Sequence, residues 1–403
     1  MLRAYKYRLY PTPEQAAYLS RSQGCVRFVY NWGLEKKIKS YQSQKEQGIE
    51  KPKSLSIYDL CKELAQLKKN PEFRWLNGPP ASSLMWALYN LDKAFRNFFR
   101  NFKNGGPSGF PKFKARSFRG SLQFHQGYSV DFASGIVKMP KCPNVKCLFH
   151  RTFEGELKTA TVSQEPSGRF FISILVETRN ELPDKKLFEK AVGIDLGVRN
   201  FITLSDGKRW DSNLILSGER KKLARAQKKL TRKEKGSKNK DKQRRRVARM
   251  HEKITDARSG YHQRVSSELI NYAVEKEYDT LVLRDYDIRK IMKKPDVIEE
   301  VKNGKTYFEK NNRAVKRKIN NMISDVAWGK FLLILKNKAD KEGINIVEVN
   351  GAYTSQKCAQ CGYVADENVK KDAFVCQACG HKEDSDLNAA INTKEEYITS
   401  LIA

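Results

Sequence analysis

Apolar residues near the start of the chain change from alternation to helical spacing. Leu2 to Leu9 alternates, with Tyr5 and Tyr7 on one side, and this pattern predicts a strand that ends before Pro11. From Thr12 as far as Phe102, apolar side chains recur every three or four residues, which predicts a block of helices. The clearest repeat in this block is Leu84, Leu88, Leu91, Phe95 and Phe98.

A second pattern begins after a boundary rich in glycine and proline at 105–111. Short alternating runs follow, and they predict a small β-barrel or sandwich. These runs are Ser121 to Phe124, Gly135 to Met139, Thr159 to Ser163 and Phe170 to Glu177. If the N-terminal strand joins them, the helical block is an insertion in a β domain.

From Lys190 onward the pattern is typical of an α/β domain. A buried strand, Ala191 to Asp195, is followed by a tight turn at Gly197 and a returning strand, Phe201 to Ser205. A long polar helical stretch then runs from Glu219 to about Lys276. The later expected elements are a strand at Thr280 to Leu283, a helix at Asn311 to Lys341, a strand at Ile344 to Val349 and a helix from about Leu387.

Basic residues strongly outnumber acidic ones. The 403 residues, enough for two or three domains, include 77 Lys and Arg against 46 Asp and Glu, a net charge of +31. Such a chain repels itself unless a polyanion neutralises it, and nucleic acid is the usual polyanion. An anionic membrane is the rival, but we find no apolar stretch of transmembrane length and no signal-peptide core. We therefore expect a nucleic-acid-binding protein of the cytosol.

The cysteine pattern predicts a zinc site. Cys358 and Cys361 form one CxxC pair, Cys376 and Cys379 form a second, and glycine follows each pair. Four thiolates at this spacing close a tetrahedral, structural Zn²⁺ site, whereas a redox pair would not explain two copies. We expect His381 to lie outside the ligand set. The remaining cysteines are expected to be core or surface thiols: Cys25, Cys61, Cys142 and Cys147.

Two aspartates occupy positions suited to a nuclease site. Asp195 ends the apolar strand in VGIDLG, and Asp386 begins the C-terminal helix in EDSDLNAAIN. Hydrolysis with two Mg²⁺ ions needs about three converging carboxylates, and the third is expected near residue 284. Both aspartates also have a structural interpretation, because many α/β strands end in Asp and Asp is a favoured helix N-cap.

Several motifs together resemble the TnpB family of transposon-encoded, RNA-guided nucleases, the ancestors of type V CRISPR effectors. The C-terminal half carries GIDLGVRNFITLSDG at 193–207, SDVAWGKF at 324–331, YTSQKCAQCG at 353–362, CQACG at 376–380 and DSDLNAAINT at 384–393. The N-terminal half is similar more loosely, through RFVYNWGL at 27–34, NLDKAFRNFFR at 90–100 and GFPKFK at 109–114. Together these motifs span nearly the whole chain.

The resemblance implies a multidomain α+β fold. A β-barrel wedge domain at 1–10 and 118–188 would be interrupted by a helical recognition domain at 11–117. An RNase H-like (RuvC) α/β domain at 189–352 would follow, with a basic helical insertion at 215–276. A zinc ribbon at 353–382 and a RuvC-like C-terminal segment at 383–403 would complete the chain. The implied partners are guide RNA and double-stranded target DNA with a short flanking motif, bound by a monomer in the prokaryotic cytosol or nucleoid.

One position departs from the family pattern. The second catalytic carboxylate of the family is a glutamate that ends the central strand, and here LVLRDY places Arg284 in that position. An arginine cannot give up its charge, and a unit charge at 4 Å is worth about 4 kcal/mol at moderate dielectric. We therefore expect Mg²⁺ binding and cleavage to fail at Asp195, Arg284 and Asp386. Guide-dependent binding would survive, because base pairing and phosphate contacts supply it.

Two alternatives preserve a working site. Glu348 is the best substitute carboxylate, because some relatives place their glutamate on that later segment, although nearer the YTS motif. Asp285 alternates to the opposite face of its strand, and Asp287 lies beyond the strand. In the other alternative, Arg284 is a surface residue on a strand misaligned by one position.

Two surfaces are candidates for nucleic-acid contact. In the family, the basic stretch 220–253 crosses the channel for the guide–target heteroduplex, although a solvated helix pair is the structural alternative. The expected phosphate contacts are Lys228, Lys229, Arg244, Arg245 and Arg246. The positions that match where relatives read the flanking motif are Tyr58, Ser82, Ser83, Met85 and Trp86, and only that of Tyr58 looks shared. For Trp86, ordinary helix core is the competing interpretation.

Three functions remain open. The first is a guide-RNA-dependent DNA-binding protein that lacks nuclease activity and represses transcription by occupying its target, as TnpB-like nuclease-dead repressors (TldR) do. The second is an active, Mg²⁺-dependent RNA-guided endonuclease with a relocated carboxylate. The third is a zinc-ribbon DNA-binding protein that needs no RNA.

Overall fold

The structure, a computed structural model, describes the chain except residues 107–108, 116–119, 179–182, 185–189, 213–215, 294–298, 303–304, 309–312, 371 and 403. Two compact units make up the chain. The first comprises Met1–Asn180 with Arg244–Arg249, and the second comprises Glu181–Gln243 with Met250–Ala403. The domain boundaries expected at 117/118, 188/189 and 215 fall outside the described residues.

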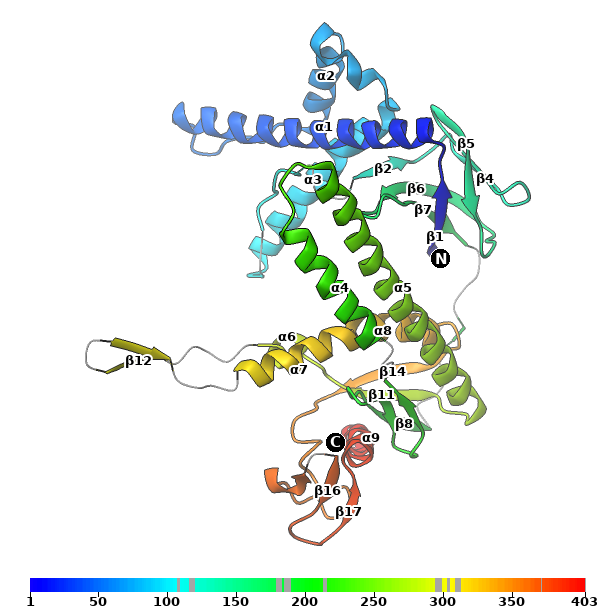
Figure 1. Cartoon of the computed structure of the whole chain (residues 1–403), viewed down its shortest axis with the longest axis vertical. Helices are drawn as coiled ribbons and strands as arrows, with labels where there is room; N and C mark the ends of the chain where they lie inside the picture. Colours follow the sequence, from blue (N-terminus) through cyan, green and yellow to red (C-terminus); the bar gives the residue numbers. More distant parts are fainter. Residues whose placement is uncertain are drawn as a thin grey trace. The chain divides into compact units, whose positions relative to one another are not determined.

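A seven-stranded antiparallel sheet forms the β part of the first unit, in the order β2-β6-β7-β1-β5-β4-β3 (Figure 1). Its strands are β1 (Leu2–Tyr10), β2 (Ser121–Phe124), β3 (Ser129–Asp131), β4 (Ile136–Met139), β5 (Cys142–Leu148), β6 (Glu156–Gln164) and β7 (Phe170–Glu177). β1 pairs with β7 and β5, so the N-terminal strand does join the later ones. The expected strands at 121–124 and 170–177 are confirmed, whereas β3 and β5 were not predicted.

The chain between β1 and β2 is helical, which confirms an inserted helical block. It contains α1 (Pro13–Glu46), α2 (Ile57–Leu67), a 3-10 helix (Pro71–Asn77) and α3 (Ala81–Lys103). α1 begins at a capping box in which the Thr12 hydroxyl accepts from the Gln15 N–H and the Gln15 side chain accepts from the Thr12 N–H. Gly33 lets α1 approach α3, because a Cβ there would lie 2.7 Å from Leu88 Cδ2.

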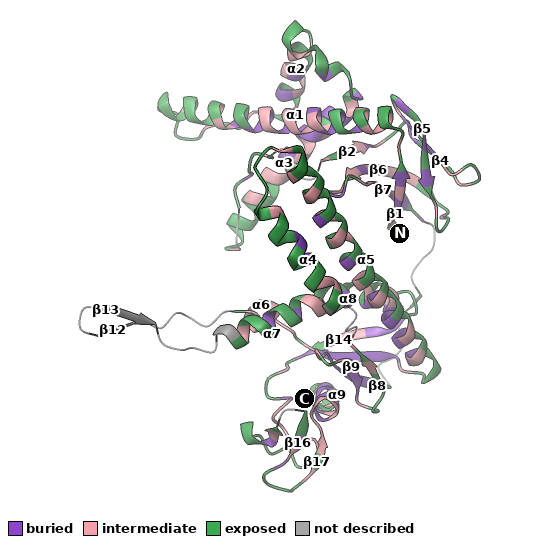
Figure 2. Ribbon diagram, in the orientation of Figure 1, coloured by how far each residue is buried: buried purple, intermediate pink, exposed green. Residues whose placement is uncertain are grey.

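The second unit is built on a five-stranded sheet in the order β10-β9-β8-β11-β14. β8 (Ala191–Asp195), β11 (Thr280–Arg284) and β14 (Asn345–Val349) are parallel, and β9 (Asn200–Leu204) and β10 (Arg209–Asp211) add antiparallel neighbours. The inner residues of β8 and β11, 192–194 and 281–283, are apolar and buried, as expected for central parallel strands, and Figure 2 shows mostly buried residues in this sheet.

Helices cover both faces of this sheet. Ile194 and Leu283 point into a core that also contains Leu269 of α5 (Lys238–Glu275) and Phe331 of α8 (Trp328–Ala339). On the other face lies α9 (Ser385–Ile402), whose Tyr397 packs against Val282 and Val349. Gly193 permits this contact, because a Cβ there would lie 2.1 Å from the Ala390 carbonyl oxygen of α9. Figure 1 shows α9 beside β8.

Two expected helices are each divided in the structure. The stretch from Glu219 to Lys276 forms α4 (Leu216–Thr231) and α5, because the chain turns at Gly236, whose φ is +90°, and Ser237 caps the second helix. The helix expected at 311–341 forms α7 (Arg313–Val326) and α8, and Ala327 between them has a left-handed φ of 53°. Residues 311–312 lie outside the described part of the chain.

The remaining elements of the second unit are short. They are α6 (Ile288–Ile291), the hairpin β12 (Glu299–Lys302) and β13 (Lys305–Phe308), a 3-10 turn (Asp366–Asn368), β15 (Val369–Lys370), β16 (Ala373–Val375) and β17 (Lys382–Asp384). No helix of the described chain combines the length and apolar character needed to cross a bilayer.

Candidate functional site: a carboxylate–arginine cluster beside a four-cysteine cluster

Asp195 and Arg284 form an ion pair at the carboxyl ends of two adjacent parallel strands. β8 and β11 pair with Ile194 beside Leu283, so the next residues, Asp195 and Arg284, are neighbours on the same face. Arg284 Nη2 lies 2.7 Å from Asp195 Oδ1, and the Asp195 side chain is only 5% exposed. The guanidinium therefore occupies the space in front of the carboxylate that would otherwise face a cation.

The arginine is held by contacts of its terminal nitrogens and of its aliphatic stem. Its Nη1 donates to the Ser355 hydroxyl at 3.0 Å and to the Thr354 hydroxyl at 3.4 Å. Its stem lies against Gly351, where a Cβ would come within 2.7 Å of Arg284 Cβ. Arg284 is thus a packed residue with only 22% of its side chain exposed, and the interpretation of a misaligned surface arginine is wrong.

Tyr286 also binds the aspartate, and its role was not predicted from the sequence. Its hydroxyl donates to Asp195 Oδ1 at 3.2 Å and accepts from the Leu196 N–H at 2.7 Å. The Arg284 guanidinium lies 4.8 Å from the centre of the Tyr286 ring, a cation–π distance. Tyr286 and Arg284 together therefore fix the Asp195 carboxylate.

The charges of this cluster are strongly coupled. Burial raises the pKa of Asp195, the Arg284 guanidinium opposes that shift, and the nearby Asp386 adds to it. Burial works to lower the pKa of Arg284, but Tyr286 and Asp195 raise it further, so the arginine stays cationic. The cation in this cluster is thus permanent.

Asp386 faces the same region and is free of a capping role. Asp384 caps α9 instead, since its Oδ1 accepts from the backbone N–H of Asp386 at 3.0 Å and of Leu387 at 3.1 Å. Asp386 Oδ2 accepts from the Asn200 side-chain amide at 3.0 Å. The N-cap interpretation of Asp386 is therefore wrong, and Asp386 remains a candidate site residue.

Glu348 lies on the opposite side of the sheet from this cluster. Its partner in the parallel pairing is Leu283, which itself pairs with Ile194. Neighbours in register share a face, and Leu283 and Ile194 point into the core beneath α5 and α8. Glu348, which is exposed, therefore lies on that face of the sheet, whereas Asp195 and Arg284 lie on the face covered by α9.

The described residues do not suit a two-Mg²⁺ site. Such a site needs about three converging carboxylates. Within the described part of the chain, three or more metal-ligating side chains come close together at the four cysteines and at no group of carboxylates. Arg284 fills the central position, so this arrangement does not support chemistry that runs through Mg²⁺.

The four cysteines fit a tetrahedral metal site. The Sγ atoms of Cys358, Cys361, Cys376 and Cys379 all lie within 4.8 Å of one another. Two of the separations are 3.8 Å and 3.6 Å, and Zn–S bonds of about 2.3 Å place tetrahedral sulfurs about 3.8 Å apart. The backbone N–H of Cys379 lowers the pKa of the Cys376 thiol, whereas hydrogen bonds with the neighbouring thiols raise the pKa of Cys361.

Backbone geometry and two asparagines hold this cluster in place. Gly362 and Gly380 have φ of 76° and 71°, so the glycine after each CxxC pair permits a left-handed turn. Asn388 of α9 donates to the Lys357 carbonyl and accepts from the Ala359 N–H. Asn392 donates to the carbonyls of Thr354 and Lys357. The asparagines of DSDLNAAINT therefore attach the first cysteine knuckle to the helix that carries Asp386.

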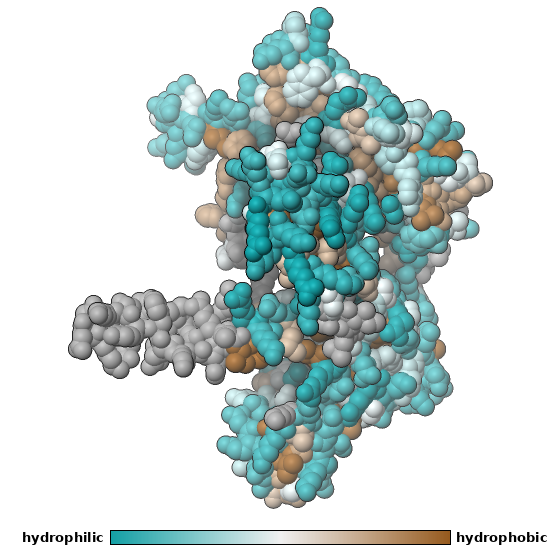
Figure 3. Space-filling view, in the orientation of Figure 1, coloured by the Kyte–Doolittle hydropathy of each residue, from teal (hydrophilic) through white to brown (hydrophobic). Residues whose placement is uncertain are grey.

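The candidate phosphate-binding side chains are exposed. They are Lys228 and Lys229 on α4 and Arg244, Arg245 and Arg246 on α5. The two helices contact each other through the Gln243 side chain, which donates to the Ala226 carbonyl at 2.9 Å. Figure 3 shows hydrophilic side chains over α4 and α5. The structure therefore leaves these cations accessible without showing what they bind.

The candidate motif-reading residues of the first unit differ in their exposure. Tyr58 is 79% exposed and Met85 41%, whereas Ser83 is 1% exposed and donates to the Gln123 carbonyl. Ser82 is partly buried. Trp86 stacks on His125 with ring centres 3.5 Å apart, which gives it a structural contact within this unit.

Comparisons with known proteins identify family models and a solved structure that are similar to this chain. Family models match residues 1–46 (a helix-turn-helix domain), 173–289 (a probable transposase) and 328–393 (a Cas12f1-like TNB domain). The chain is similar to the cryo-EM structure of a Cas12f1-sgRNA-target DNA complex, with a TM-score of 0.56, 14% identity and 98% of each chain covered. At this identity the likeness concerns the fold.

Two curated relatives cover almost the whole chain. One, named "Putative RNA-guided DNA endonuclease InsQ", is from Escherichia coli K12 and is 31% identical over 97% of this chain and 91% of its own length. Another, "Putative RNA-guided DNA endonuclease", is from Streptomyces pristinaespiralis and is 33% identical over 97% of this chain and 88% of its own length. The chain is thus a multidomain α+β protein whose fold is similar to that of a Cas12f1 structure. The chain belongs to the TnpB family.

Proposed function

We propose that this chain is a guide-RNA-dependent DNA-binding protein that lacks nuclease activity and represses transcription by occupying its target. The family relationship supports RNA and double-stranded DNA as partners, and the net charge of +31 suits them. In this proposal the sheet of the second unit forms the core of a RuvC-like domain, and the sheet of the first unit forms a wedge domain. The four cysteines of the cluster hold Zn²⁺.

The loss of cleavage rests on the Arg284–Asp195 ion pair. A two-metal nuclease holds Mg²⁺ between the ends of these strands, and a guanidinium 2.7 Å from the carboxylate takes that place. The cation also cancels the negative charge that would attract a metal. Glu348 does not supply the missing carboxylate, because it lies on the other face of the sheet.

Binding does not need these carboxylates. Base pairing between a guide and its target reads the sequence, and exposed Lys and Arg side chains neutralise phosphates. In this proposal Lys228, Lys229 and Arg244–Arg246 serve the second task. Tyr58 and Met85 remain exposed candidates for contact with a flanking duplex motif.

Occupancy can be tested without a cleavage assay. The RNA that co-purifies with the protein would be sequenced, and a reporter promoter would be given the DNA sequence matched by the 3′ part of that RNA. We expect repression of this reporter, and we expect Asp386→Asn, which keeps the contact with Asn200, to repress equally well. Unchanged target binding after ribonuclease treatment would contradict guide dependence and would favour RNA-independent DNA binding.

An active endonuclease is the second candidate, and the names of the two relatives favour it. It requires a carboxylate from elsewhere to complete the site. In that case Asp386→Asn would abolish activity on the target, whereas a protein that acts by occupancy would be unaffected.

A further inference from the structure

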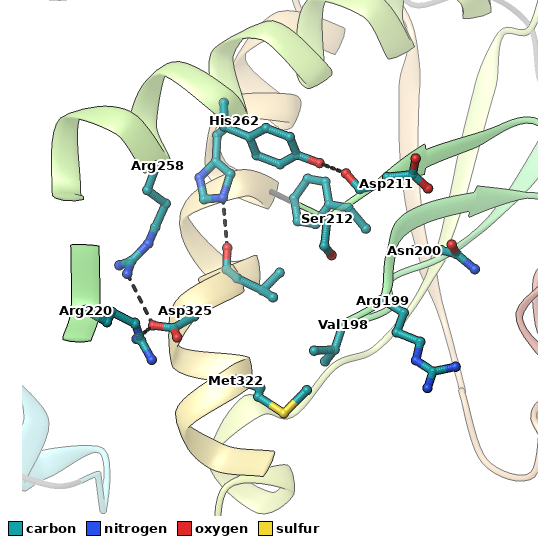
Figure 4. Close-up of a pocket in the computed structure, with 13 residues that line it drawn as sticks. Val198, Arg199, Asn200, Asp211, Ser212, Arg220, Arg258, His262, Met322 and Asp325 are labelled. Atoms are coloured by element: carbon teal, nitrogen blue, oxygen red, sulfur yellow. Dashed lines mark hydrogen bonds and ion pairs between the residues drawn. The ribbon is translucent and has the colours of Figure 1, made fainter. Parts of the chain in front are cut away.

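A cavity of about 820 Å³ lies in the second unit, beside the β8–β9 turn (Figure 4). α4, α5, α7 and the end of β10 supply the rest of its wall. The lining residues are Val198, Arg199, Asn200, Phe201, Asp211, Ser212, Arg220, Arg258, Tyr261, His262, Met322, Asp325 and Val326. None of them belongs to the ion pair or the cysteine cluster described above.

In the inner part of the cavity two arginines share one carboxylate, which leaves an excess of one positive charge there; the other acidic lining residue, Asp211, is exposed. Arg220 and Arg258 both pair with the single carboxylate of Asp325, and Figure 4 shows the two side chains directed at it. Arg199 is neutralised by Asp372 outside the cavity. Burial lowers the pKa of both Arg220 and Arg258, so their charged forms are less stable here than in water. One additional anion would compensate this excess.

Buried polar atoms of the lining residues also lack partners. His262 is 1% exposed, and its Nε2–H donates to the Val326 carbonyl at 2.8 Å, so Nδ1 is left as an acceptor. Among the described residues, His262 Nδ1, Arg258 Nε and Ser212 Oγ have no hydrogen-bond partner. Unpaired buried groups are costly, so a ligand carrying both donors and acceptors would stabilise them.

Much of the remaining wall is apolar or aromatic. It consists of Val198, Phe201, Tyr261, Met322 and Val326. A flat aromatic ligand would fit this wall, and the volume lies in the range of small-ligand pockets. A nucleobase combines an aromatic face with donors and acceptors at its edge, and its phosphate supplies the anion.

The cavity also adjoins the carboxylate–arginine cluster. Asn200 lines the cavity and at the same time donates its side-chain amide to Asp386 Oδ2. Asn200 therefore links the wall of the cavity to Asp386. We propose that the cavity binds one unstacked nucleotide of single-stranded nucleic acid, with the base against the apolar wall and a phosphate on Arg220 and Arg258. The proposed nucleotide site has a role separate from the proposed repression, and nucleotide binding in the cavity does not require a guide RNA.

Photo-crosslinking tests this proposal directly. The full-length protein would be irradiated with a short oligothymidylate that carries 4-thiothymidine, and in a second arm with an oligouridylate that carries 4-thiouridine. Crosslinked peptides would be identified by mass spectrometry. We expect peptides containing Tyr261 or Met322 in at least one arm, and the stronger arm would show whether DNA or RNA is the source of the nucleotide.

Three variants separate the cavity from general charge. Arg258→Gln removes the anion contact, and Met322→Trp fills the cavity from a position that is 41% exposed. Each should lower the yield of cavity crosslinks about tenfold, the scale of losing one stacked base. Lys336→Gln, at an exposed residue of α8 that does not line the cavity, should change it by less than about twofold.

Thermal unfolding of each variant would establish that it is folded. Absence of cavity peptides in both arms would overturn the proposal, even if guide-dependent repression were intact. Unchanged cavity crosslinks in both Arg258→Gln and Met322→Trp would overturn it as well. Loss of crosslinks with inorganic phosphate at millimolar concentration would support the phosphate contact.

Discussion

Arg284 Nη2 lies 2.7 Å from Asp195 Oδ1, at the point where two adjacent parallel strands end. The pair is enclosed by Tyr286, Thr354 and Ser355, and Gly351 makes room for the arginine stem. Asp195 and Arg284 thus form a packed ion pair with its own hydrogen bonds. This pair has consequences for stability as well as for chemistry.

Removing the arginine should destabilise the second unit. Arg284→Leu leaves the Asp195 carboxylate buried without its cation, and breaking one side of a buried pair costs about 3–5 kcal/mol. We expect Arg284→Leu to lower the free energy of unfolding, measured in urea, by about 3 kcal/mol. Adding Asp195→Asn should recover part of this loss, because the two substitutions remove one interaction.

The exposed pair of Arg264 and Glu268 is the matched control for this measurement. Its side chains are 62% and 42% exposed, so Arg264→Leu should cost less than about 1 kcal/mol. Strictly additive effects of Arg284→Leu and Asp195→Asn would show that the two residues do not act as a pair.

The cysteine cluster should contain zinc in the purified protein. Cys376→Ser removes one of four ligands, so we expect metal content, measured by atomic emission, to fall strongly. Residues 353–384 should then lose protection from proteolysis, because a structural Zn²⁺ stabilises the fold around it. Cys61→Ser, at a partly buried cysteine of the first unit, should leave the metal content unchanged. Equal zinc in both variants would count against the site.

Protonation of His262 should destabilise the fold. Burial lowers its pKa below the ordinary value of 6.5, and the charges of Lys330 and Arg258 act in the same direction. The unfolded chain therefore takes up the proton first, so stability is present above pH 6.5 and is lost as the pH falls through the lower folded-state pKa. As the pH falls below 6.5, the melting temperature of the His262→Gln variant should decrease less steeply than that of the wild-type protein. An identical pH profile would show that His262 does not contribute.

Phosphate contacts by α4 should appear in the salt dependence of binding. Each phosphate contact adds about 0.9 to the slope of log affinity against log salt for duplex DNA. We expect Lys228→Gln with Lys229→Gln to reduce that slope by about 2. The control Lys336→Gln with Lys341→Gln changes two exposed lysines near the end of α8. Similar slopes for both double variants would contradict a specific role of α4.

The α/β core could be predicted well from sequence, whereas breaks in helices could not. β8 and β11 are mainly apolar runs whose burial favours strands, and β14 carries Ile346, Val347 and Val349 beside two polar residues. Ala327 gives no local sign of its left-handed φ of 53°. The break depends on tertiary contacts, since Trp328 donates to the Gly197 carbonyl and Phe331 is buried in the core.

The site was predictable where neighbouring strand ends define it. Asp195 and Arg284 each end a recognisable strand, so their proximity follows from the sheet. Tyr286 lies just beyond its strand, and its contact with Asp195 depends on how the chain leaves the sheet. The roles of Asn388 and Asn392 were also hidden, because their partners Lys357 and Thr354 lie 31 and 38 residues away in sequence, just before the first cysteine pair.

The most direct test is cleavage of a supercoiled plasmid that carries the target matched by the co-purified RNA. The wild-type protein with Mg²⁺ should bind this plasmid and leave it intact. Arg284→Glu would place a carboxylate beside Asp195 and Asp386, and any cleavage gained in this variant would identify the arginine as the cause of inactivity. Mg²⁺-dependent cleavage by the wild-type protein, lost in Asp386→Asn, would contradict the account.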